Sequence, residues 1–570
     1  MDMGKSKVLG NARTGSDGPT KEPGKKPCSD LKAQGVALSS DIVSFMMDPA
    51  SYKDKTIKVE HKETHISHVF LTERFAYKIK KPVDFGFLDF TTLKKREFYC
   101  NEELRLNKRL CPDLYLGVVR ITYSEKGLEV NGSGRAVEYA IKMRRMPDDA
   151  IMTQMVKEGK VNAGIISRIA SIIAGFHMKN AQENKPVIGK KPMAWFGREA
   201  VREAVEQNFS QTEKYIGVLI DRKKYDFIRD AAHEFLEKRK EMFDARIKEG
   251  RIIEYHGDLH TGNIFISNRD IQIFDCIEFN ESFRCGDAVN DVAFLAMDLD
   301  FLGKESLSKH FIKKYVEFTG DYTVYSLLNF YKCYRAYVRA KVTSFMYDDP
   351  NNTDAKKDEL MSTARKYYWL AFEYAQHLNA KRPLLMISCG VSGTGKSRWL
   401  KFASDIAGGM LFRTDAVRKK LFSLTGKEAK DDEYRKRYYN DKSMQKVYDF
   451  IFDKAEQILE HGGNVAIDAS FIKKSNRDAA RDIANRHDAD FVVIYTTCRE
   501  ETAKNRIHKR MQDKSNISDA DFEHAYLYQT NNIEAPGKDE NVIHINTDMD
   551  SEANLKSLKK NLDKKLNIRI

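Results

Sequence analysis

The hydrophobic and polar positions divide the first part of the chain into segments of different period. Residues 1–37 are rich in Gly, Lys, Ser and Pro and show almost no apolar periodicity, so we expect a disordered basic tail. Ordered sequence begins near Ser40, where a helix is expected. Residues 64–71 and 75–80 then alternate between apolar and polar positions. This alternation predicts two strands joined by a tight turn.

A longer stretch of mixed pattern follows. The charged segment 93–110 carries apolar residues at helical spacing, and 115–121 and 136–143 are expected strands. Residues 151–250 have a mostly helical and highly charged pattern. The aromatic-rich run 330–337 is interpreted as core packing between helices. This part of the chain therefore predicts a small sheet followed by a helical region.

From residue 384 onward, short apolar strands alternate with helical segments. The expected strands are 384–389, 464–468, 491–498 and 542–546, and a lysine-rich helix follows the last of them. Strands that alternate with helices in this way require a parallel sheet with helices on both faces. The C-terminal part is therefore predicted to be an α/β domain.

Length and composition agree with this division. A chain of 570 residues is too long for one core, and we expect a tail at 1–37 and domains at 38–378 and 379–570. The net charge of +13 is spread along the sequence, which favours sites for polyanionic nucleotides over a nucleic-acid partner, although nucleic acid stays possible. The eight cysteines show no CxxC pair and no apolar run reaches the length of a membrane span. We expect a cytoplasmic protein with reduced thiols and no membrane partner.

The stretch His256-Gly-Asp-Leu-His-Thr-Gly-Asn263 carries the first candidate chemistry. Asp258 is followed by Asn263, by a short apolar hairpin and then by Asp275. An acid can accept the proton of an attacking hydroxyl, while an amide and a second acid can hold Mg2+ against the phosphates of ATP. The hairpin is expected to place Asn263 and Asp275 at neighbouring ends, where both reach one ion.

The pattern HGDLHxGN with a later I-x-D resembles the aminoglycoside phosphotransferase and choline kinase branch of the kinase fold, over roughly residues 38–345. The resemblance implies an α+β two-lobed domain with Asp258 as the catalytic residue. Two departures from the protein-kinase pattern are Gly257 in place of Arg and Asp-Cys-Ile-Glu278 in place of Asp-Phe-Gly. A glycine-rich loop does not precede the first strands, so phosphate covering by backbone amides is not expected there.

The same resemblance implies a lysine and a glutamate in the small lobe. Lys78 occupies the strand position from which a kinase lysine reaches the ATP phosphates, and Lys80 on the same strand face is the alternative. Glu103 matches the helix glutamate, with Glu97 and Glu102 as alternatives.

Two further groups of polar residues lie near these elements. The resemblance implies an acid after the loop that supports it by hydrogen bonds, and Asp287 and Asp291 are both candidates for it. His61, His65 and His68 are not expected to share a metal ion, because His65 and His68 point to opposite faces of a strand.

A second nucleotide site is predicted directly after the strand at 384–389. Gly390-Val391-Ser392-Gly393-Thr394-Gly395-Lys396-Ser397 fits the P-loop pattern G-x-x-x-x-G-K-[ST]. The glycines let backbone amides wrap the phosphates, and the N-terminus of the following helix adds partial positive charge. Lys396 is expected to contact the outer phosphates of ATP, and Ser397 to coordinate Mg2+.

The residues beyond the loop resemble those of small P-loop kinases such as polynucleotide kinases and zeta-toxin kinases. Asp415 and Arg418 match the D-x-x-R signature, which implies that Asp415 activates an acceptor hydroxyl and Arg418 binds phosphate. A helix cap is the alternative role for Asp415. Asp468 ends an apolar strand and is expected to hold Mg2+ or bind acceptor. Arg510, on a basic helix with Arg506, resembles a lid residue that closes on the phosphates.

The whole layout resembles bacterial bifunctional proteins that join an aminoglycoside phosphotransferase-like domain to an AAA-type P-loop kinase domain. It implies an α/β P-loop NTPase domain with a parallel sheet after the kinase-like domain. ATP and Mg2+ are the expected cofactors, and phosphoryl transfer to the hydroxyl of a small molecule or of a polynucleotide 5′ end is the expected activity. Two other hypotheses stay open, a regulatory protein in which one site senses nucleotide and a nucleic-acid-binding end-repair kinase. The acceptor is not identified by the sequence.

Overall fold

The computed structural model describes residues 39–183, 187–188, 191–267, 270–378, 382–424, 432–512 and 525–566. The tail expected at 1–37 lies outside the described residues, as does most of the predicted junction near residue 379. The chain divides into two compact units. The first contains the residues through Asp84 together with Asp89–Cys100 and Leu116–Arg145, and the second contains Phe85–Leu88, Asn101–Tyr115 and the chain from Met146 onward. The domain limits predicted at 38 and 378 stay predictions.

The first unit is built on a six-stranded sheet of order β1-β2-β3-β6-β4-β5. Helix α2 (Ser39–Met47) packs on this sheet, where Ile42 and Met46 join a core with Tyr77 and Ile79. The strands are β1 (Glu60–Glu63), β2 (Ser67–Leu71), β3 (Phe75–Lys80), β4 (Tyr115–Ser124), β5 (Gly127–Val130) and β6 (Arg135–Arg144). Helix α3 (Leu93–Asn107) has residues in both units.

The strand predicted at 64–71 is wrong at its start. Thr64 to Ile66 form a turn, in which the Thr64 N–H donates to the Ser67 carbonyl (2.9 Å) and the Thr64 hydroxyl accepts from the Ser67 N–H (3.0 Å). These side-chain and backbone bonds end the strand pairing locally. The turn joins β2 to β1, a strand that the polar sequence Glu-His-Lys-Glu did not predict.

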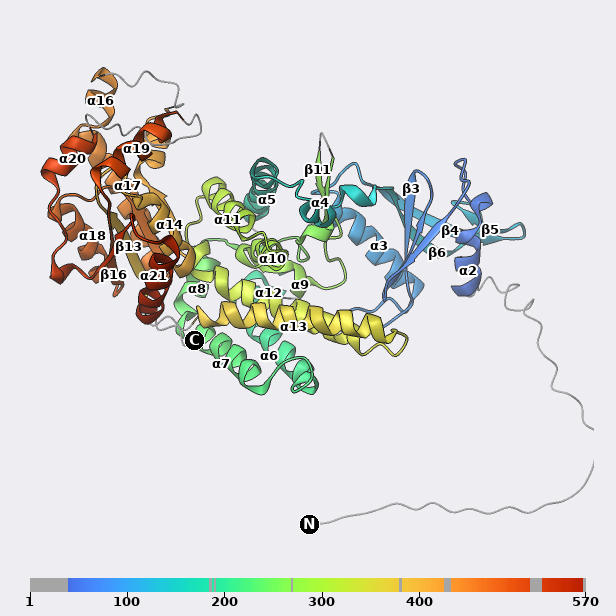
Figure 1. Cartoon of the computed structure of the whole chain (residues 1–570). Coiled ribbons are helices and arrows are strands. Elements are labelled where there is room, and N and C mark those ends of the chain that lie inside the picture. Colours follow the sequence, from blue (N-terminus) through green and yellow to red (C-terminus); the bar gives the residue numbers. More distant parts are fainter. Residues whose placement is uncertain are drawn as a thin grey trace, which may run out of the picture. The chain divides into compact units, whose positions relative to one another are not determined.

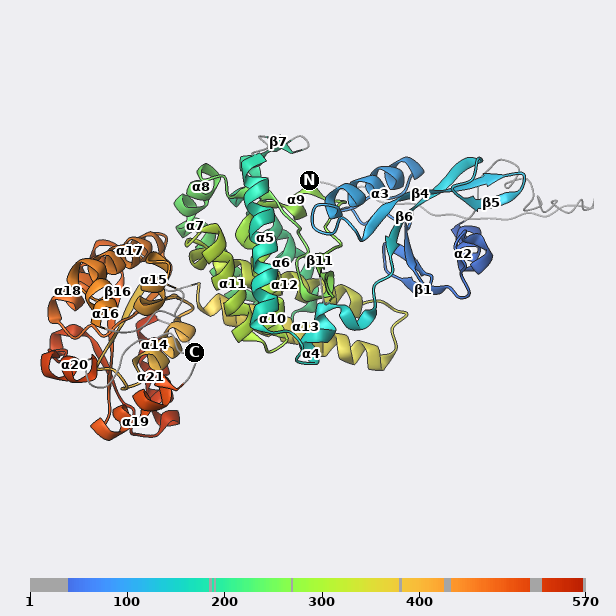
Figure 2. The same cartoon turned by 90° about the horizontal axis from the view of Figure 1, so that it is seen from above.

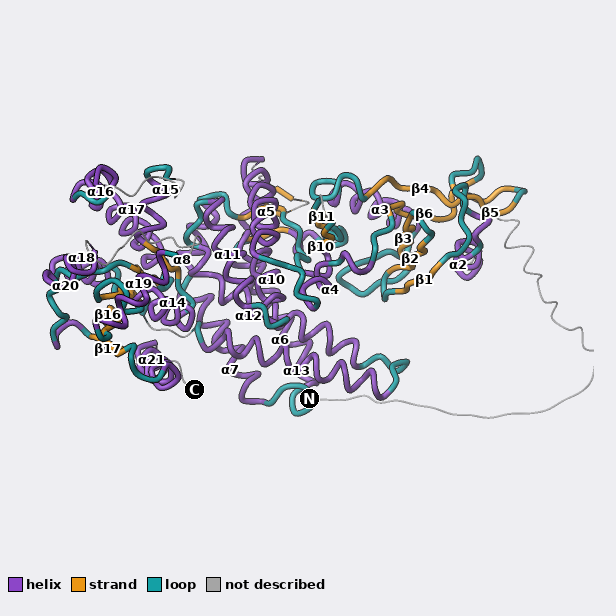
Figure 3. The backbone as a smooth tube through the Cα atoms, turned by 45° about the horizontal axis from the view of Figure 1, so that its top comes forward, coloured by secondary structure: helices purple, strands orange, loops and turns teal. Residues whose placement is uncertain are grey.

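The second unit contains a helical region, in which strands are few and short (Figure 3). Helix α5 (Ala163–Glu183) packs along α11 (Glu305–Thr319), as Figure 2 shows, and α12 (Val324–Tyr347) packs along α13 (Asp354–Gln376). The aromatic run 330–337 is core, since Phe330, Tyr331 and Tyr337 are buried. The other helices are α4 (Met152–Lys157), α6 (Arg198–Thr212), α7 (Arg222–Lys238), α8 (Lys240–Lys248), α9 (Glu281–Arg284) and α10 (Ala288–Phe301). The short strands are β7 (Val187–Ile188), β8 (Lys191–Pro192), β9 (Ile252–Glu254), β10 (Ile264–Ile266), β11 (Ile271–Ile273) and β12 (Cys285–Asp287).

The C-terminal part of the second unit is a five-stranded sheet of order β14-β15-β13-β16-β17, in which every pairing is parallel. Helices cover both faces (Figure 1), as predicted. On one face Met386 packs with Leu400 of α14 and Leu558 of α21, and on the other Ile387 belongs to a core with Ile451 of α17. The strands are β13 (Leu384–Cys389), β14 (Met410–Arg413), β15 (Val465–Asp468), β16 (Asp490–Thr497) and β17 (Val542–Asn546). The helices are α14 (Lys396–Ala407), α15 (Thr414–Leu421), α16 (Asp432–Tyr438), α17 (Asp441–Glu460), α18 (Lys474–Arg486), α19 (Glu500–Met511), α20 (Leu527–Asn532) and α21 (Ser551–Leu566).

Two general expectations can be compared with the described residues. The seven cysteines among them are free thiols, and six are buried. In the same part of the chain, no helix is both long enough and apolar enough to cross a membrane.

Candidate active sites

The hairpin predicted after Asn263 is confirmed. Strands β10 and β11 pair antiparallel with Ile264 opposite Ile273, and the next bond outward runs from the Phe274 N–H to the Asn263 carbonyl (3.0 Å). Ile264 and Ile273 are fully buried, so the hairpin is anchored by its apolar residues. Phe274 is thus the residue opposite Asn263, and Asp275 follows it directly. The two predicted metal ligands therefore leave the hairpin at the same end.

Asn263 is bonded to the candidate catalytic residue Asp258. Its side-chain amide donates to the Asp258 carboxylate oxygen Oδ2 (2.9 Å) and to the Asp258 carbonyl (3.0 Å). Both bonds use the nitrogen of the amide, so the amide oxygen is left to accept a ligand. Within the described part of the chain, the Oδ1 atom of Asp258 accepts no hydrogen bond, so it too is available to a ligand.

His260 fixes the charge of Asp258. Its Nδ1 atom accepts from the Gly262 N–H (3.0 Å), which places the proton of the neutral ring on Nε2, 3.4 Å from Asp258 Oδ2. Burial alone would raise the pKa of Asp258, but His260 and then Arg339 outweigh it and hold that pKa well below its usual range. Asp258 is therefore ionised at neutral pH, as an acceptor of a hydroxyl proton must be.

Asp291 of α10 supports the catalytic loop. Its carboxylate accepts the backbone N–H of His256 (3.2 Å) and of Gly257 (2.9 Å), and the Nε2 atom of His177 lies 3.1 Å away. Of the two predicted candidates it is thus Asp291 that holds the loop. The other, Asp287, instead forms a buried ion pair with Arg246 (2.6 Å).

Gly257 explains the departure from the protein-kinase pattern at this position. Its φ of +87° lies in the left-handed region, and a Cβ atom there would come within 2.6 Å of the Phe283 carbonyl oxygen. Side chains are excluded from both the conformation and the space.

Asp275 and Asn263 fit a magnesium ion by their chemistry. Asp275 has a φ of +64°, an unusual value for a residue with a side chain and one found at sites that the surrounding fold constrains. A carboxylate and the free oxygen of an amide are the ligands that Mg2+ prefers. The role of both residues as ligands stays a prediction.

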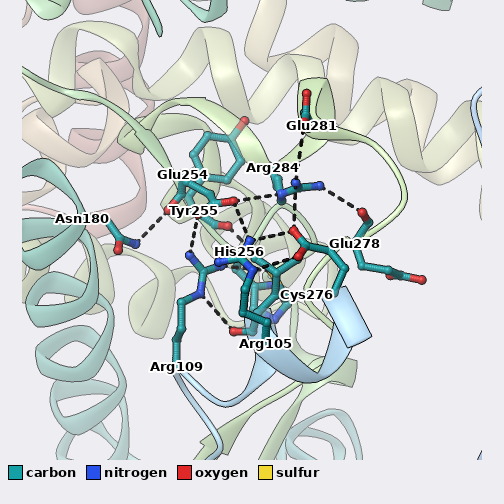
Figure 4. Close-up of polar contacts among 12 residues, drawn as sticks. Arg105, Arg109, Asn180, Glu254, Tyr255, His256, Cys276, Glu278, Glu281 and Arg284 are labelled. Atoms are coloured by element: carbon teal, nitrogen blue, oxygen red, sulfur yellow. Dashed lines mark hydrogen bonds and ion pairs between the residues drawn. The ribbon is translucent and has the colours of Figure 1, made fainter. Parts of the chain in front are cut away.

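A network that the sequence did not predict surrounds Glu254, the last residue of β9 (Figure 4). The buried carboxylate of Glu254 accepts from Arg284 (3.1 Å), Arg109 (3.1 Å) and Arg105 (3.4 Å). Arg109 also reaches the sulfur of Cys276, 3.6 Å away, next to Asp275. The network therefore joins the end of α3 to the strand before the loop and to the residue after Asp275. Its residues lie far apart in the sequence, so no local pattern indicates it.

The predicted lysine and glutamate of the small lobe are placed on β3 and α3. Lys78 is half-buried, whereas Lys80 is buried with its ammonium nitrogen 4.8 Å from the centre of the Phe90 ring. Glu103 is fully buried, and the alternative Glu102 bonds to Arg105. Lys78 and Glu103 belong to different compact units, so their pairing stays a prediction.

The P-loop follows β13 directly and leads into α14. Gly393 and Gly395 have φ values of +83° and +93°, and a Cβ on Gly393 would lie 2.7 Å from the Ala503 carbonyl oxygen. Lys396 donates to the Val391 carbonyl across the loop (2.8 Å), and burial lowers its pKa to about 8. Ser397 is exposed in the first turn of α14. The remaining loop residues are Gly390, Ser392 and Thr394.

Acidic and basic side chains gather beside this loop. Asp468 ends β15, and it accepts from Ser388 of the adjacent strand (3.3 Å) and from Arg413 (3.3 Å). Its carboxylate, with the exposed hydroxyl of Ser397, offers the oxygen ligands that suit Mg2+. The carboxylate of Asp468 raises the pKa of Lys396 and the guanidinium of Arg510 lowers it, so both side chains lie near the loop lysine.

Asp415 and Arg418 are bonded to each other in α15, with 3.1 Å between Arg418 and the Asp415 carboxylate. Arg418 is buried and lies over the Tyr439 ring, 3.9 Å from its centre. Arg506, the companion of Arg510 on α19, bonds to the Gly393 carbonyl (3.3 Å) and to Thr547. The roles predicted for Asp415, Arg418 and Arg510 toward acceptor and phosphate stay predictions.

The β10–β11 hairpin and the P-loop on a parallel sheet define a protein with a kinase-like part followed by a P-loop nucleotide-binding domain. Residues 385–535 match the family model described as an AAA domain. An uncharacterised protein of Mycobacterium tuberculosis (strain ATCC 25618 / H37Rv) is 32% identical over 432 residues, which cover 75% of this chain and 81% of the relative. A protein of Mycobacterium bovis (strain ATCC BAA-935 / AF2122/97), also uncharacterised, matches with the same values. The chain belongs to the family of these mycobacterial proteins.

Solved structures of kinases are also similar. A choline kinase from Cryptosporidium parvum Iowa II is 11% identical and covers 59% of this chain and 94% of its own, with a TM-score of 0.38. An amicoumacin kinase in complex with AMP-PNP, Ca2+ and Ami is 14% identical, with coverage of 60% and 96% and a TM-score of 0.35. A gluconokinase from Sinorhizobium meliloti 1021 is 16% identical, with coverage of 33% and 95% and a TM-score of 0.24. At such low scores, the fold rests on the topology described above.

Proposed function

We propose that the protein is an ATP-dependent phosphotransferase with two nucleotide sites, each transferring the γ-phosphoryl group of ATP to a hydroxyl. The observation that carries this proposal is the pair Asp258–Asn263 at the mouth of the β10–β11 hairpin. Asn263 binds Oδ2 of Asp258 through its nitrogen, so the amide oxygen of Asn263 and Oδ1 of Asp258 are not used in this pair. One atom is suited to a hydroxyl proton and the other to a metal ligand.

The reaction at this site follows from those positions. Asp258, ionised because His260 and Arg339 lower its pKa, orients the acceptor hydroxyl and accepts its proton. As the acceptor oxygen bonds to the γ-phosphorus, the bond from that phosphorus to the β–γ bridging oxygen breaks, and ADP leaves. Asn263 and Asp275 would hold Mg2+. The bound ion would neutralise the negative charge that develops on the phosphates of ATP. Asp291 keeps the backbone of the loop fixed through the N–H groups of His256 and Gly257.

The P-loop site uses separate residues. Backbone amides of Gly393 to Lys396 and the N-terminus of α14 bind the phosphates, and Lys396 leaves the Val391 carbonyl to contact them. Ser397 and Asp468 would hold Mg2+, and Asp415 orients the second acceptor. The acceptor classes that we propose are hydroxylated small molecules and polynucleotide 5′ ends.

The test is transfer of label from [γ-32P]ATP to a panel of aminoglycosides, sugars, nucleosides and 5′-hydroxyl oligonucleotides. Asp258→Asn should abolish transfer to one acceptor class, whereas Asp270→Asn, on an exposed residue of the same hairpin, should not. Lys396→Ala should abolish P-loop transfer, whereas Lys401→Ala, on the exposed side of α14, should not. Wild-type protein that transfers label to none of the acceptors and only hydrolyses ATP through Lys396 would refute the proposal.

A nucleotide sensor is the second candidate function, favoured by contacts inside the P-loop. Gln529 of α20 accepts both the N–H (2.7 Å) and the hydroxyl (3.0 Å) of Ser392. A nucleotide whose phosphates accept hydrogen bonds from Ser392 must displace the Gln529 side chain. Nucleotide binding is thereby coupled to movement of α20. A sensor requires that Lys396→Ala changes turnover at the Asp258 site, and an unchanged turnover there would exclude it.

A further inference from the structure

The hairpin of β1 and β2 in the first unit gathers three potential metal ligands on one face. Glu63 lies opposite His68 in the antiparallel register, and His61 lies two residues before Glu63 on the same strand. Residues two apart on a strand share a face, and directly opposed residues share it too. His61, Glu63 and His68 therefore project from the same side of the hairpin.

The ligand atoms of these side chains converge. One nitrogen of each histidine and one oxygen of Glu63 all lie within 4.8 Å of one another. The Nε2 atom of His61 and the Nδ1 atom of His68 share a hydrogen bond of 3.1 Å, which a bound ion would replace. Two nitrogens bound to one tetrahedral zinc ion lie roughly 3.3 Å apart, given bonds of about 2.0 Å. The two imidazoles already have the separation that a shared ion requires.

Packing holds the two rings in this arrangement. The His61 ring stacks on Phe70 with the ring centres 4.9 Å apart and an angle of 16° between the planes. The His68 ring stacks on His61 at 5.2 Å. The fold has therefore already restricted the conformations of the two imidazole rings. An ion that binds them loses little further conformational entropy of these rings.

We propose that His61, Glu63 and His68 form a binding site for a divalent transition-metal ion of the zinc class, with water as the remaining ligand. Two imidazole nitrogens and one carboxylate oxygen suit Zn2+ and its neighbours, whereas Mg2+ takes oxygen ligands. This site is therefore chemically distinct from the proposed magnesium sites of the two nucleotide-binding centres. Bound metal cross-links β1 to β2.

The ion pair of Glu63 affects how the site binds. Lys81 forms this pair, so the metal must displace an ammonium group from the carboxylate.

His65 provides a matched control in the turn between β1 and β2. It is exposed in the Thr64–Ile66 turn, and it is not part of the converging group. A metal held only by imidazoles of a histidine-rich loop would depend on His65, whereas the proposed site does not.

The experiment measures zinc bound to the full-length chain without nucleotide. Metal-free wild type, His65→Ala, Glu63→Gln and the double variant His61→Ala/His68→Ala are equilibrated with ZnCl2 and dialysed, and the bound zinc is counted by atomic absorption. Wild type and His65→Ala should hold one more zinc per chain than the double variant, and Glu63→Gln should bind it at least tenfold more weakly. Equal zinc in wild type and the double variant would overturn the proposal, as would an equal loss in His65→Ala.

A second measurement separates ligation from misfolding. The circular dichroism spectra of the metal-free variants should match that of wild type. Co2+ in place of Zn2+ should give the visible absorption of a tetrahedral site in wild type and His65→Ala, but not in the double variant. A six-coordinate cobalt spectrum in wild type would contradict the proposed ligand set.

Discussion

Replacement of Asp291 by Asn tests whether the catalytic loop depends on one buried carboxylate. Asp291 is fully buried, and its two oxygens accept from His256 N–H, Gly257 N–H and His177. Asparagine has the same shape but one acceptor oxygen, so its NH2 group must face at least one of these donors. A hydrogen bond to a charged acceptor contributes about 1.5–3 kcal/mol, and a buried donor left unsatisfied costs about 1–3 kcal/mol.

The expected loss of unfolding free energy is therefore about 3–5 kcal/mol, the range found when one partner is removed from a buried charge pair. Urea unfolding of the full chain measures this loss, and hydrogen exchange of the peptide that contains His256 and Gly257 localises it. If the loop opens separately, exchange there should be about 100-fold faster or more, since each factor of ten corresponds to about 1.4 kcal/mol. Transfer of label at the Asp258 site should fall in parallel.

The dependence on pH follows from the direction of the pKa shift. Although burial would raise the pKa of Asp291, the bonds and charge of His177 and the charge of His256 lower it below its usual value of 3.8. A depressed pKa in the folded state means that the stabilisation is present above the unfolded pKa and is lost as pH falls through the folded one. The difference between wild type and Asp291→Asn should therefore be constant near neutral pH and shrink below about pH 4.

The control for this experiment is Asp230→Asn on the surface of α7, where the side chain is 67% exposed. Its unfolding free energy should stay within about 0.5 kcal/mol of wild type. An Asp291→Asn protein with the same stability as this control, and with unchanged exchange at the loop, would refute the role that we assign to Asp291.

Three further substitutions test other parts of the structure. Lys396→Ala should lower turnover at the P-loop by about 100-fold or more without loss of fold, because phosphate charge is left unpaired there; a rate like that of Lys401→Ala would contradict this. Gly393→Ala should weaken nucleotide binding at the P-loop, measured by titration calorimetry, because of its φ of +83° and the contact of 2.7 Å with Ala503; unchanged affinity would show that the loop adapts. Glu254→Gln should cost about 3 kcal/mol in urea unfolding, since three arginines lose a buried charge; a neutral result would show that the network tolerates a neutral acceptor.

Elements with a clear local pattern could be predicted from the sequence. The apolar runs around the hairpin 264–273 predicted both strands, because each run is short and separated by polar turn residues. The strand at 542–546 was predicted at its observed bounds, and the glycine spacing identified the P-loop between β13 and α14. In these cases the signal lies within about ten residues.

Features that depend on distant contacts could not be predicted. Strand β1 has the polar sequence Glu-His-Lys-Glu, so its pairing with β2 is not visible in its own residues. The choice of Asp291 over Asp287 depends on which side of α10 meets the loop, and both acids lie near the start of that helix. Glu254 receives its arginines from Arg105 in α3, from Arg109 just after that helix and from Arg284, and nothing local to β9 indicates them.

The order of the parallel sheet sets when the second nucleotide site can form during synthesis. Strand β13 carries the P-loop, but its two neighbours are β15 and β16, which end at Asp468 and Thr497. A nascent chain that has just released the P-loop from the ribosome has neither neighbour, and β13 is exposed as an apolar strand with two open edges. Because the Asp258 hairpin pairs residues only a few positions apart, it can close much earlier. The two sites therefore mature in sequence, and an interval in which only the first is assembled accompanies every round of translation.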